Sequence, residues 1–554
     1  MHKIVLVGIN SKYIHTNLGI RYIREYLKKN GLQIEIVESS INNSINEIIR
    51  EIYEKKPDIL GFSVYIWNVE YTFKIIKEIK KIMPDTKIYL GGPEVSYDCE
   101  KIMTNIEEID GIIAGSGEKS FFTLVTEGEE KTESFYYRKD NKIVYNERKN
   151  IENINEIPFP YTEEELEDRT KIIYYESSRG CPFLCAYCLS SIDKRVLFFD
   201  EEKVLKELKL FLDKEVKLVK FVDRTYNLNK DRYMKIWNFL YENYNEKTAF
   251  HFEISADMLD EDVIEFLKKV PNGYFQFEIG VQSSNVETLK AVNRSTDLKK
   301  LEENIMQIGD NIHLHLDLIA GLPHEDFNTF ANSFDFVYKM GPEMVQLGFL
   351  KILKGTEMEK IAIRDGYKYF DYPPYEIVEN KYISFKEILR LKDIDTIVDN
   401  FYNSGRFKKS IEFIIEKFYQ SPFQFYNEFA EFWDKKGYNR VAHKTVSFFD
   451  YIYEFYNYKN FKDIEIFKEQ LKYDYLMMGK PGVFPAWYKR EVNREIYREK
   501  VENREEFESN REAYKKSELE IFKGNILGEK EEKIAVLFLY LKGGVKTEVY
   551  YIND

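Results

Sequence analysis

Three of the four cysteines of this 554-residue chain lie close together and could hold a metal centre. The segment SSRGCPFLCAYC (177–188) places Cys181, Cys185 and Cys188 in a Cys-x3-Cys-x2-Cys spacing. Three thiolates on one short loop can bind three irons of a [4Fe–4S] cluster. The fourth cysteine, Cys99, is far away in the sequence. The fourth iron therefore keeps an open position, which is where a metal binds substrate or cofactor.

An open iron on such a cluster can be chelated by the amino and carboxylate groups of S-adenosylmethionine (SAM). An electron from the cluster then cleaves the sulfonium and releases a 5′-deoxyadenosyl radical. Tyr187, directly before the third cysteine, can lie against the adenine. The alternative is a zinc site completed by a fourth ligand such as His251. The cysteine spacing, Tyr187 and the position of the loop after a predicted strand favour the iron–sulfur cluster.

Composition and charge narrow the class of protein. The net charge is −14, and an acidic chain is repelled by nucleic acid, which argues against a general polynucleotide-binding role. Few, clustered cysteines indicate reduced thiols and a cytoplasmic location. The first residues lack the apolar stretch of a signal peptide, and no run of about 18 apolar residues predicts a membrane span.

The elements that position the cysteine loop follow a strand–helix alternation. Residues 1–135 predict a doubly wound, Rossmann-like sheet, because short apolar runs alternate with amphipathic helices such as 68–83. The strands are expected at 3–9, 34–39, 59–64, 87–92 and 111–115. Residues 136–169 are predicted to form a polar hairpin (136–150) and a proline-containing linker.

A second alternation covers residues 170–365 and predicts a partial (β/α)6 barrel. The strands are expected at 172–180, 218–224, 249–255, 274–282, 313–321 and 344–352. A flat doubly wound sheet is the competing arrangement, because periodicity alone does not separate the two. Residues 366–554 predict a mostly helical domain, with a charged helix around 488–516 and a terminal hairpin at 533–552.

Together these motifs resemble the cobalamin-binding branch of the radical SAM superfamily. FEISAD (252–257), FEIGVQS (277–283), VNR (292–294) and DLIAGLP (317–323) are similar to its barrel segments, and KFVDRTYN (220–227) replaces its usual Gly-Gly-Glu. The resemblance implies that Glu253 and Ser255 face the ribose or methionine part of SAM. It also implies that Arg294 pairs with the SAM carboxylate, as a bidentate arginine can. Further implied cofactor contacts are Tyr187, Asp223, Arg224 and Gln282.

Three glycine-bearing loops of the N-terminal domain are similar to those of the cobalamin module in this branch. They read GFSVYIWN (61–68), GGPEV (91–95) and AGSGEKS (114–120), and glycine lets the backbone approach a ligand closely. The resemblance implies contacts to the corrin or its nucleotide tail from Ser63, Trp67 and Asn68. Residues implied to line or flank the cleft of the tail are Gly91, Gly92, Pro93, Gly115, Gly117 and Glu118.

One loop departs from the family pattern. Modules that supply a protein ligand to cobalt carry Asp-x-His-x-x-Gly after the first strand, whereas this chain reads NSKYIHTNLG (10–19). Tyr13 occupies the position of the aspartate before His15, and the glycine comes one residue late. A metal-binding imidazole needs a partner to orient it. We therefore expect bound cobalamin to have its own base displaced and no protein nitrogen in its place.

The resemblance implies an enzyme with three cofactors: a [4Fe–4S] cluster, SAM and cobalamin. The expected reaction is methyl transfer from methylcobalamin to an unactivated carbon of a small-molecule, lipid or peptide substrate. One SAM would remethylate the cobalamin and a second would supply the radical, with electrons from a flavodoxin or ferredoxin. The alternatives are a radical rearrangement or cyclisation without methylation, and a sensor without turnover. Residues 366–554 resemble an uncharacterised extension of one subgroup, with strings such as FYNSGRF (401–407) and PAWYKR (485–490).

Overall fold

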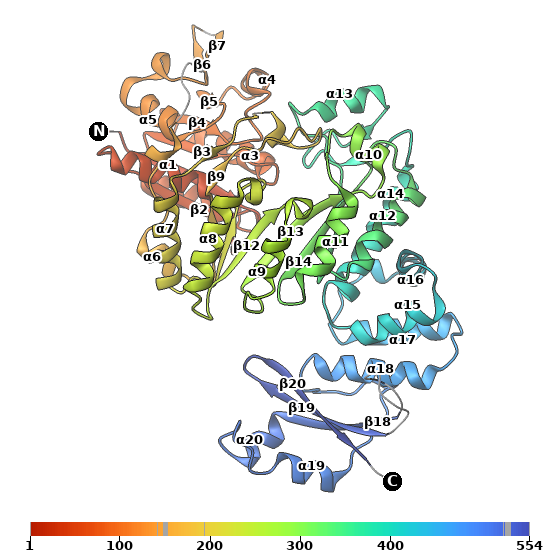
Figure 1. Cartoon of the computed structure of the whole chain (residues 1–554). Coiled ribbons are helices and arrows are strands. Elements are labelled where there is room, and N and C mark those ends of the chain that lie inside the picture. Colours follow the sequence, from red (N-terminus) through yellow and green to blue (C-terminus); the bar gives the residue numbers. More distant parts are fainter. Residues whose placement is uncertain are drawn as a thin grey trace. The chain divides into compact units, whose positions relative to one another are not determined.

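The computed structural model describes residues 2–140, 142–147, 153–192, 194–523, 526 and 533–552 (Figure 1). These residues form two compact units, one of residues 1–326 with 348–384 and the other of 327–347 with 385–554. Across the described ranges, the helices are too short or too polar to cross a bilayer.

The N-terminal sheet has the strand order β2-β1-β3-β4-β5-β6-β7. Its first five strands are parallel, and every residue of β1 is buried, as expected for a sheet covered on both faces. The order reverses between β1 and β3, which creates a switch point where ligands bind beyond the carboxyl ends of the strands. The strands are β1 (Ile4–Asn10), β2 (Glu35–Ser40), β3 (Ile59–Ser63), β4 (Lys87–Gly91), β5 (Gly111–Ile113), β6 (Phe135–Lys139) and β7 (Lys142–Asn146).

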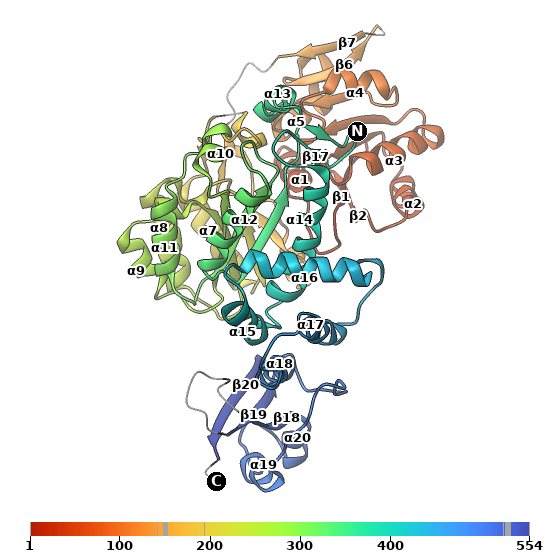
Figure 2. The same cartoon turned by 90° about the vertical axis from the view of Figure 1, so that its right-hand side faces the viewer.

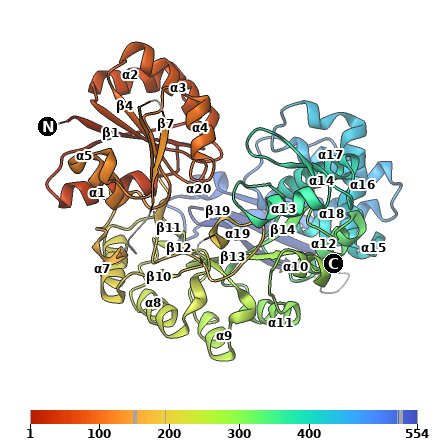
Figure 3. The same cartoon turned by 90° about the horizontal axis from the view of Figure 1, so that it is seen from above.

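Helices cover both faces of this sheet, which confirms the doubly wound prediction (Figure 3). On one face, α1 (Leu18–Lys29) and α5 (Glu118–Glu127) bury side chains such as Leu27 and Phe121. On the other face, α2 (Ile45–Lys55), α3 (Val69–Ile82) and α4 (Cys99–Asn105) bury a larger aliphatic core.

The predicted hairpin is present and pairs with the edge of the N-terminal sheet. Strand β6 pairs antiparallel with β5, and β7 pairs antiparallel with β6. The N-terminal domain therefore extends beyond the predicted boundary at residue 135. Residues 141 and 148–150 of the predicted hairpin, and 151–152 of the linker, lie outside the described residues. A short helix, α6 (Glu163–Glu167), precedes the barrel.

The second sheet has the order β15-β14-β13-β12-β11-β8, which is the chain order without a reversal. Right-handed crossovers then place all connecting helices on one side, so this is the predicted partial barrel and not a doubly wound sheet. Figure 3 shows these helices along one side of the strands. The elements are β8 (Ile173–Tyr175), β11 (Leu218–Phe221), β12 (Ala249–Ile254), β13 (Phe275–Gln282), β14 (His313–Ala320), β15 (Met344–Phe349), α7 (Glu201–Asp213), α8 (Lys230–Glu242), α9 (Glu261–Leu267), α10 (Val286–Ala291) and α11 (Leu298–Ile308).

The two faces of the barrel strands differ in polarity. In β13 and β14, apolar side chains alternate with polar ones, and the apolar set is buried. Parallel pairing aligns Glu253 with Glu278 and Glu278 with His315, so polar side chains share the face opposite the apolar core. The inside of the barrel is therefore a polar surface.

The second unit is helical and ends in the antiparallel sheet β18-β19-β20 (Figure 2). Leu476 of α18 packs on one face of this sheet, and Val501 and Ala513 pack on the other. The terminal hairpin was predicted, but β18 was not, and the charged helix expected around 488–516 is divided into α19 and α20. The elements are α12 (Phe327–Lys339), α14 (Phe385–Ile397), α15 (Lys408–Phe418), α16 (Pro422–Lys436), α17 (Ser447–Tyr458), α18 (Ile464–Met477), α19 (Arg494–Val501), α20 (Asn510–Lys515), β18 (Ser517–Phe522), β19 (Ile534–Leu541) and β20 (Gly544–Tyr551).

Candidate functional site

The cysteine loop follows β8 and closes one end of a small cavity. Cys181, Cys185 and Cys188 all line this cavity, whose volume is about 190 Å³. Gly180 has φ +100, and a Cβ there would lie 1.9 Å from the carbonyl oxygen of Arg195, so only glycine fits. Among the described residues, no three His, Cys, Asp or Glu side chains lie close enough together to hold a single metal ion. A cubane cluster binds each thiolate at a different iron, so its ligands need not converge on one point.

Arg294 lies beside the cysteines, as the sequence predicted for a SAM-binding residue. Its Nη1 is 3.9 Å from Cys185 Sγ and 3.4 Å from Tyr187 Oη, and its Nη2 donates to the carbonyl of Gly280. The loop is tied to the same region by the backbone bond from Ala186 N to Val292 O at 2.9 Å. Barrel strand, helix end and cysteine loop therefore meet at this guanidinium.

We call the cavity lined by the three cysteines the cysteine cavity. It contains buried polar atoms without a hydrogen-bond partner among the described residues. They are Nε of Arg294, Oε1 of Gln282 and Oδ1 of Asp317. Gln282 also has φ +69 at a bulge of β13, and strained backbone of this kind concentrates at functional sites. SAM carries a carboxylate, an amino group and ribose hydroxyls that could bond to such atoms. The residues present therefore fit SAM.

Three carboxyl groups of the cysteine cavity have different protonation behaviour. Burial raises the pKa of Glu253 to about 7, although the charge of Arg224 opposes the shift. Burial, Glu278 and Glu253 together raise the pKa of Asp317 to about 8. A hydrogen bond from His251 and the charge of Lys220 lower the pKa of Glu278 to about 2, against the effect of burial. At neutral pH, Glu278 is therefore ionised, Asp317 is mostly protonated and Glu253 is about half-protonated.

Of the predicted SAM contacts, Tyr187, Arg224, Glu253, Ser255, Gln282 and Arg294 line the cysteine cavity. Asp223 does not, because its side chain faces the backbone and hydroxyls at the end of β8. Its carboxylate accepts bonds from Ser177 N at 2.9 Å, Ser177 Oγ at 2.7 Å and Ser178 Oγ at 2.6 Å. Asp223 therefore ties two strand ends together. It was predicted to contact SAM, but it does not line the cysteine cavity.

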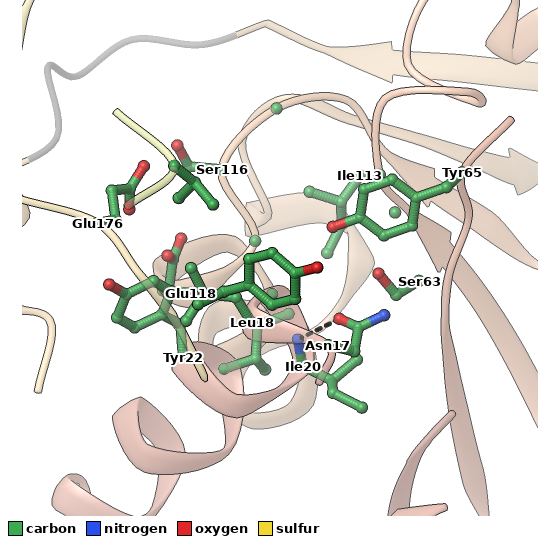
Figure 4. Close-up of a pocket in the computed structure, with 18 of the residues that line it drawn as sticks. Asn17, Leu18, Ile20, Tyr22, Ser63, Tyr65, Ile113, Ser116, Glu118 and Glu176 are labelled. Carbon is green, nitrogen blue, oxygen red and sulfur yellow. Dashed lines mark hydrogen bonds between the residues drawn. The ribbon is translucent and has the colours of Figure 1, made fainter. Parts of the chain in front are cut away.

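A larger cavity of about 710 Å³ lies beyond the carboxyl ends of the N-terminal strands, at the switch point (Figure 4). We call it the corrinoid cavity. It is bounded by loops of the N-terminal domain on one side and by Glu176, Arg179 and Arg224 of the barrel on the other. The predicted residues that line it are Ser63, Trp67, Gly91, Gly92, Gly115, Gly117 and Glu118.

The lining of the corrinoid cavity suits a large ligand that contacts the backbone. Gly92 has φ +110, and a Cβ there would lie 2.4 Å from the carbonyl oxygen of Val64. Gly115 has φ +132 and open space where a Cβ would be. Oε2 of Glu118 is buried without a hydrogen-bond partner among the described residues. Gly92 thus lets its loop pack against the backbone of Val64, whereas the space at Gly115 is open. An amide-rich ligand such as cobalamin can approach the backbone at Gly115 and donate to the carboxylate of Glu118, so the residues fit it.

Two predicted corrinoid contacts do not line the cavity. Asn68 is completely buried, and its amide donates to the carbonyls of Ile9 and Ser63 and accepts from Tyr65 N. It therefore holds the loop after β3 in place. Pro93 is exposed and lies outside the cavity lining.

Sequence reasoning missed Tyr65 of the corrinoid cavity and the contact that His15 makes there. Tyr65 stacks on Trp67 with ring centroids 4.4 Å apart, and both rings line the cavity. His15 also lines it, and its Nδ1 lies 2.7 Å from the hydroxyl of Tyr174 on β8. The partner that His15 lacks in its own loop is thus supplied by the barrel. No local pattern could have revealed this contact, because the two residues are far apart in the sequence.

Arg179 joins the corrinoid cavity to the cysteine loop. Its guanidinium bonds to both carboxylate oxygens of Glu176 at 2.9–3.3 Å, to Glu118 Oε1 at 2.9 Å and to Ser116 Oγ at 3.3 Å. Glu118 begins α5 of the N-terminal domain, whereas Arg179 directly precedes Gly180 and Cys181. We call these contacts the Arg179 clamp.

Three protein families match successive parts of the chain. The B12 binding domain matches residues 4–125, the radical SAM superfamily residues 175–337, and a protein family of unknown function (DUF4080) residues 365–538. The first two matches cover the domains that form the two cavities.

Relatives and solved structures agree with these assignments. An uncharacterized methyltransferase of Pyrococcus horikoshii, PH0819, is 25% identical over 365 residues, which are 63% of this chain and 79% of the relative. An anaerobic magnesium-protoporphyrin IX monomethyl ester cyclase of Rubrivivax gelatinosus is 22% identical over 384 residues, which are 65% of this chain and 68% of the relative. The solved structure of the radical S-adenosylmethionine methyltransferase TsrM from Kitasatospora setae, with tryptophan substrate and a SAM analogue bound, shares the fold. It has a TM-score of 0.57 at 15% identity and covers 68% of this chain and 80% of TsrM. This chain is a radical SAM enzyme with an N-terminal B12-binding domain and a C-terminal DUF4080 domain, and its cofactors are cobalamin, a [4Fe–4S] cluster and SAM.

Proposed function

We propose that this enzyme methylates an unactivated carbon of a substrate that binds between the corrinoid cavity and the cysteine cavity. The observation that carries the proposal is that Arg224 lines both cavities, so the two sites share a wall. When bound, cobalamin supplies a methyl group and the cluster with SAM supplies a carbon radical. A substrate at the shared wall can meet both. The similarity to PH0819, named as a methyltransferase, supports methyl transfer.

The residues of the chain have separate tasks in this proposal. Cys181, Cys185 and Cys188 bind the cluster, and the guanidinium of Arg294 binds the SAM carboxylate. Bound SAM and substrate would fill the cysteine cavity and exclude water, which protects a reactive intermediate from side reactions. Asp317, being largely protonated, can donate a hydrogen bond through its carboxyl to a ribose or substrate oxygen. A flavodoxin or ferredoxin supplies electrons.

Labelled SAM tests the proposal. Protein reconstituted anaerobically with cluster and cobalamin is supplied with a reductant, with SAM carrying a trideuteromethyl group, and with small-molecule, lipid and peptide fractions of host cells. We expect 5′-deoxyadenosine and a product that has gained the labelled methyl group. The matched control replaces Cys181, Cys185 and Cys188 by alanine, whereas Cys99→Ala should behave as wild type, because Cys99 is buried in α4, in the other domain.

The alternative reaction is radical cyclisation without methylation, which the name of the Rubrivivax gelatinosus relative suggests but the methyltransferase relatives do not favour. Formation of 5′-deoxyadenosine with a product that has lost hydrogen but gained no label would support cyclisation. Zinc as the sole stoichiometric metal, or protein that binds no corrinoid, would contradict both reactions.

A further inference from the structure

Arg224 occupies the boundary between the two cavities. It follows the end of β11 after Asp223 and lines both the corrinoid cavity and the cysteine cavity. Its side chain is exposed, and its charge acts on groups from both sides. It opposes the burial that raises the pKa of Tyr65 in the N-terminal domain, and the burial that raises the pKa of Glu253 on β12.

The positive charge of Arg224 is not neutralised by the part of the chain that the structure describes. Within those residues its guanidinium forms no hydrogen bond and no ion pair. The other arginines of the cavities are engaged, because Arg179 binds Glu118 and Glu176, and Arg294 binds Gly280 and Tyr187. Arg179 thus already pairs with two carboxylates of the corrinoid cavity, Glu176 on the barrel side and Glu118 at the start of α5.

The anionic groups of the cofactors have other partners in the proposed function. SAM has a single carboxylate, which is assigned to Arg294 beside the cysteines. The only ionised group of cobalamin's organic part is the phosphodiester of its nucleotide tail. The loop at Gly115, where a Cβ would meet open space, can receive that tail through backbone groups. The guanidinium of Arg224 therefore remains available to the anionic group of a third molecule that reaches the shared wall.

We propose that Arg224 binds a carboxylate or phosphate group of the substrate and thereby fixes the reacting carbon between the two cavities. This inference rests on the proposed function, since only a substrate that meets both cofactors must reach the shared wall. The planar guanidinium forms two parallel hydrogen bonds with either oxyanion, which orients the substrate as well as attracting it. Arg224 is then a substrate-binding residue rather than the SAM contact that its sequence position implies.

Chemical modification of the native holoprotein tests the inference. Protein loaded with cluster, cobalamin and SAM is treated with phenylglyoxal, which modifies accessible guanidinium groups, and each site is followed by peptide mass spectrometry. Arg50 is the internal reference, because it is exposed on α2 and lies outside both cavities. Benzoate probes a carboxylate site, inorganic phosphate a phosphate site, and benzamide is the neutral match to benzoate.

We expect Arg224 to react in the holoprotein at a rate similar to that of Arg50. Benzoate or phosphate at about ten times its Kd should slow modification of Arg224 about tenfold, because only the unbound fraction reacts. Benzamide should have no effect, and Arg50 should be unaffected by all three probes.

Three results would overturn the inference. If cobalamin or SAM alone protects Arg224, its anion belongs to a cofactor, and the proposed function stands without this assignment. If benzoate and phosphate both fail to protect it, Arg224 is no oxyanion site. If the protein binds no corrinoid, the proposed function fails and the inference fails with it.

Discussion

The Arg179 clamp offers a quantitative test of how the cysteine loop is held against the B12-binding domain. Arg179→Met keeps an unbranched side chain similar to the aliphatic stem of arginine but removes the bonds to Glu118, Glu176 and Ser116. The side chains of Glu118 and Glu176 are only 6% and 13% exposed, so two largely buried carboxylates would lose the cation that they bond to.

The expected loss of stability follows from this burial. Removing one partner of a buried ion pair costs about 3–5 kcal/mol, because the other charge stays buried without compensation. Arg179 itself is 24% exposed, which lets water reach the site and places the cost at the lower end, about 3 kcal/mol. With a urea dependence of about 3 kcal/mol per M, the unfolding midpoint should fall by about 1 M.

Urea unfolding of the wild type and the variant measures the shift, and hydrogen exchange of peptides from residues 1–326 reports on the first unit separately. Adding Glu118→Gln and Glu176→Gln to Arg179→Met should recover most of the loss, since no uncompensated charge remains. Arg50→Met is the surface control and should change stability by no more than about 0.5 kcal/mol. A midpoint for Arg179→Met that matches the control would refute the reasoning. So would a triple variant no more stable than the single one.

Three further predictions concern the cofactors and the barrel interior. Arg294→Ala should weaken SAM binding in equilibrium dialysis and leave the iron content unchanged; unaltered SAM affinity would contradict the assignment. Tyr174 gives His15 a phenol partner, which orients an imidazole less firmly than the missing aspartate would. Electron paramagnetic resonance of bound cob(II)alamin should therefore show no nitrogen splitting from an axial ligand, whereas a splitting that disappears in His15→Ala would show that His15 coordinates cobalt. Because the folded-state pKa of Glu278 is lowered to about 2, its stabilising contribution is complete above the usual value of 4.5 and is lost as the pH falls through about 2. The destabilisation by Glu278→Gln should therefore shrink over that range in urea titrations, and a constant difference would argue against an ionised Glu278.

Local sequence patterns were sufficient for most of the fold. The alternation of short strands with amphipathic helices located the parallel strands of both sheets. Burial on both faces leaves continuous apolar runs in the N-terminal sheet, whereas barrel strands such as β13 and β14 alternate apolar and polar residues. The hairpin of β6 and β7 was predicted as well. Its pairing with β5 was not, since pairing at a sheet edge depends on a strand that is distant in the sequence. The strand β18 was missed for the same reason, because its partner β19 follows more than ten residues later.

The site was predicted best where its residues are contiguous. The cysteine loop is a single segment, and it comes together with Glu253, Gln282 and Arg294 as expected. Asp223 shows the limit of reasoning by position, because its neighbour Arg224 lines the cavity whereas Asp223 bonds to Ser177 and Ser178. Successive residues after a strand point in different directions, and packing alone decides which of them faces a ligand.

The sequence by itself determined the cluster-binding spacing, the order of the domains and the polar inner face of the barrel. These features depend on neighbouring residues and on the two-residue repeat of a strand. Tertiary structure alone decided that Tyr174 contacts His15, that Arg179 contacts Glu118, and that Arg224 separates the two cavities. Each of these depends on the docking of one sheet against another, which brings together side chains that no local pattern connects.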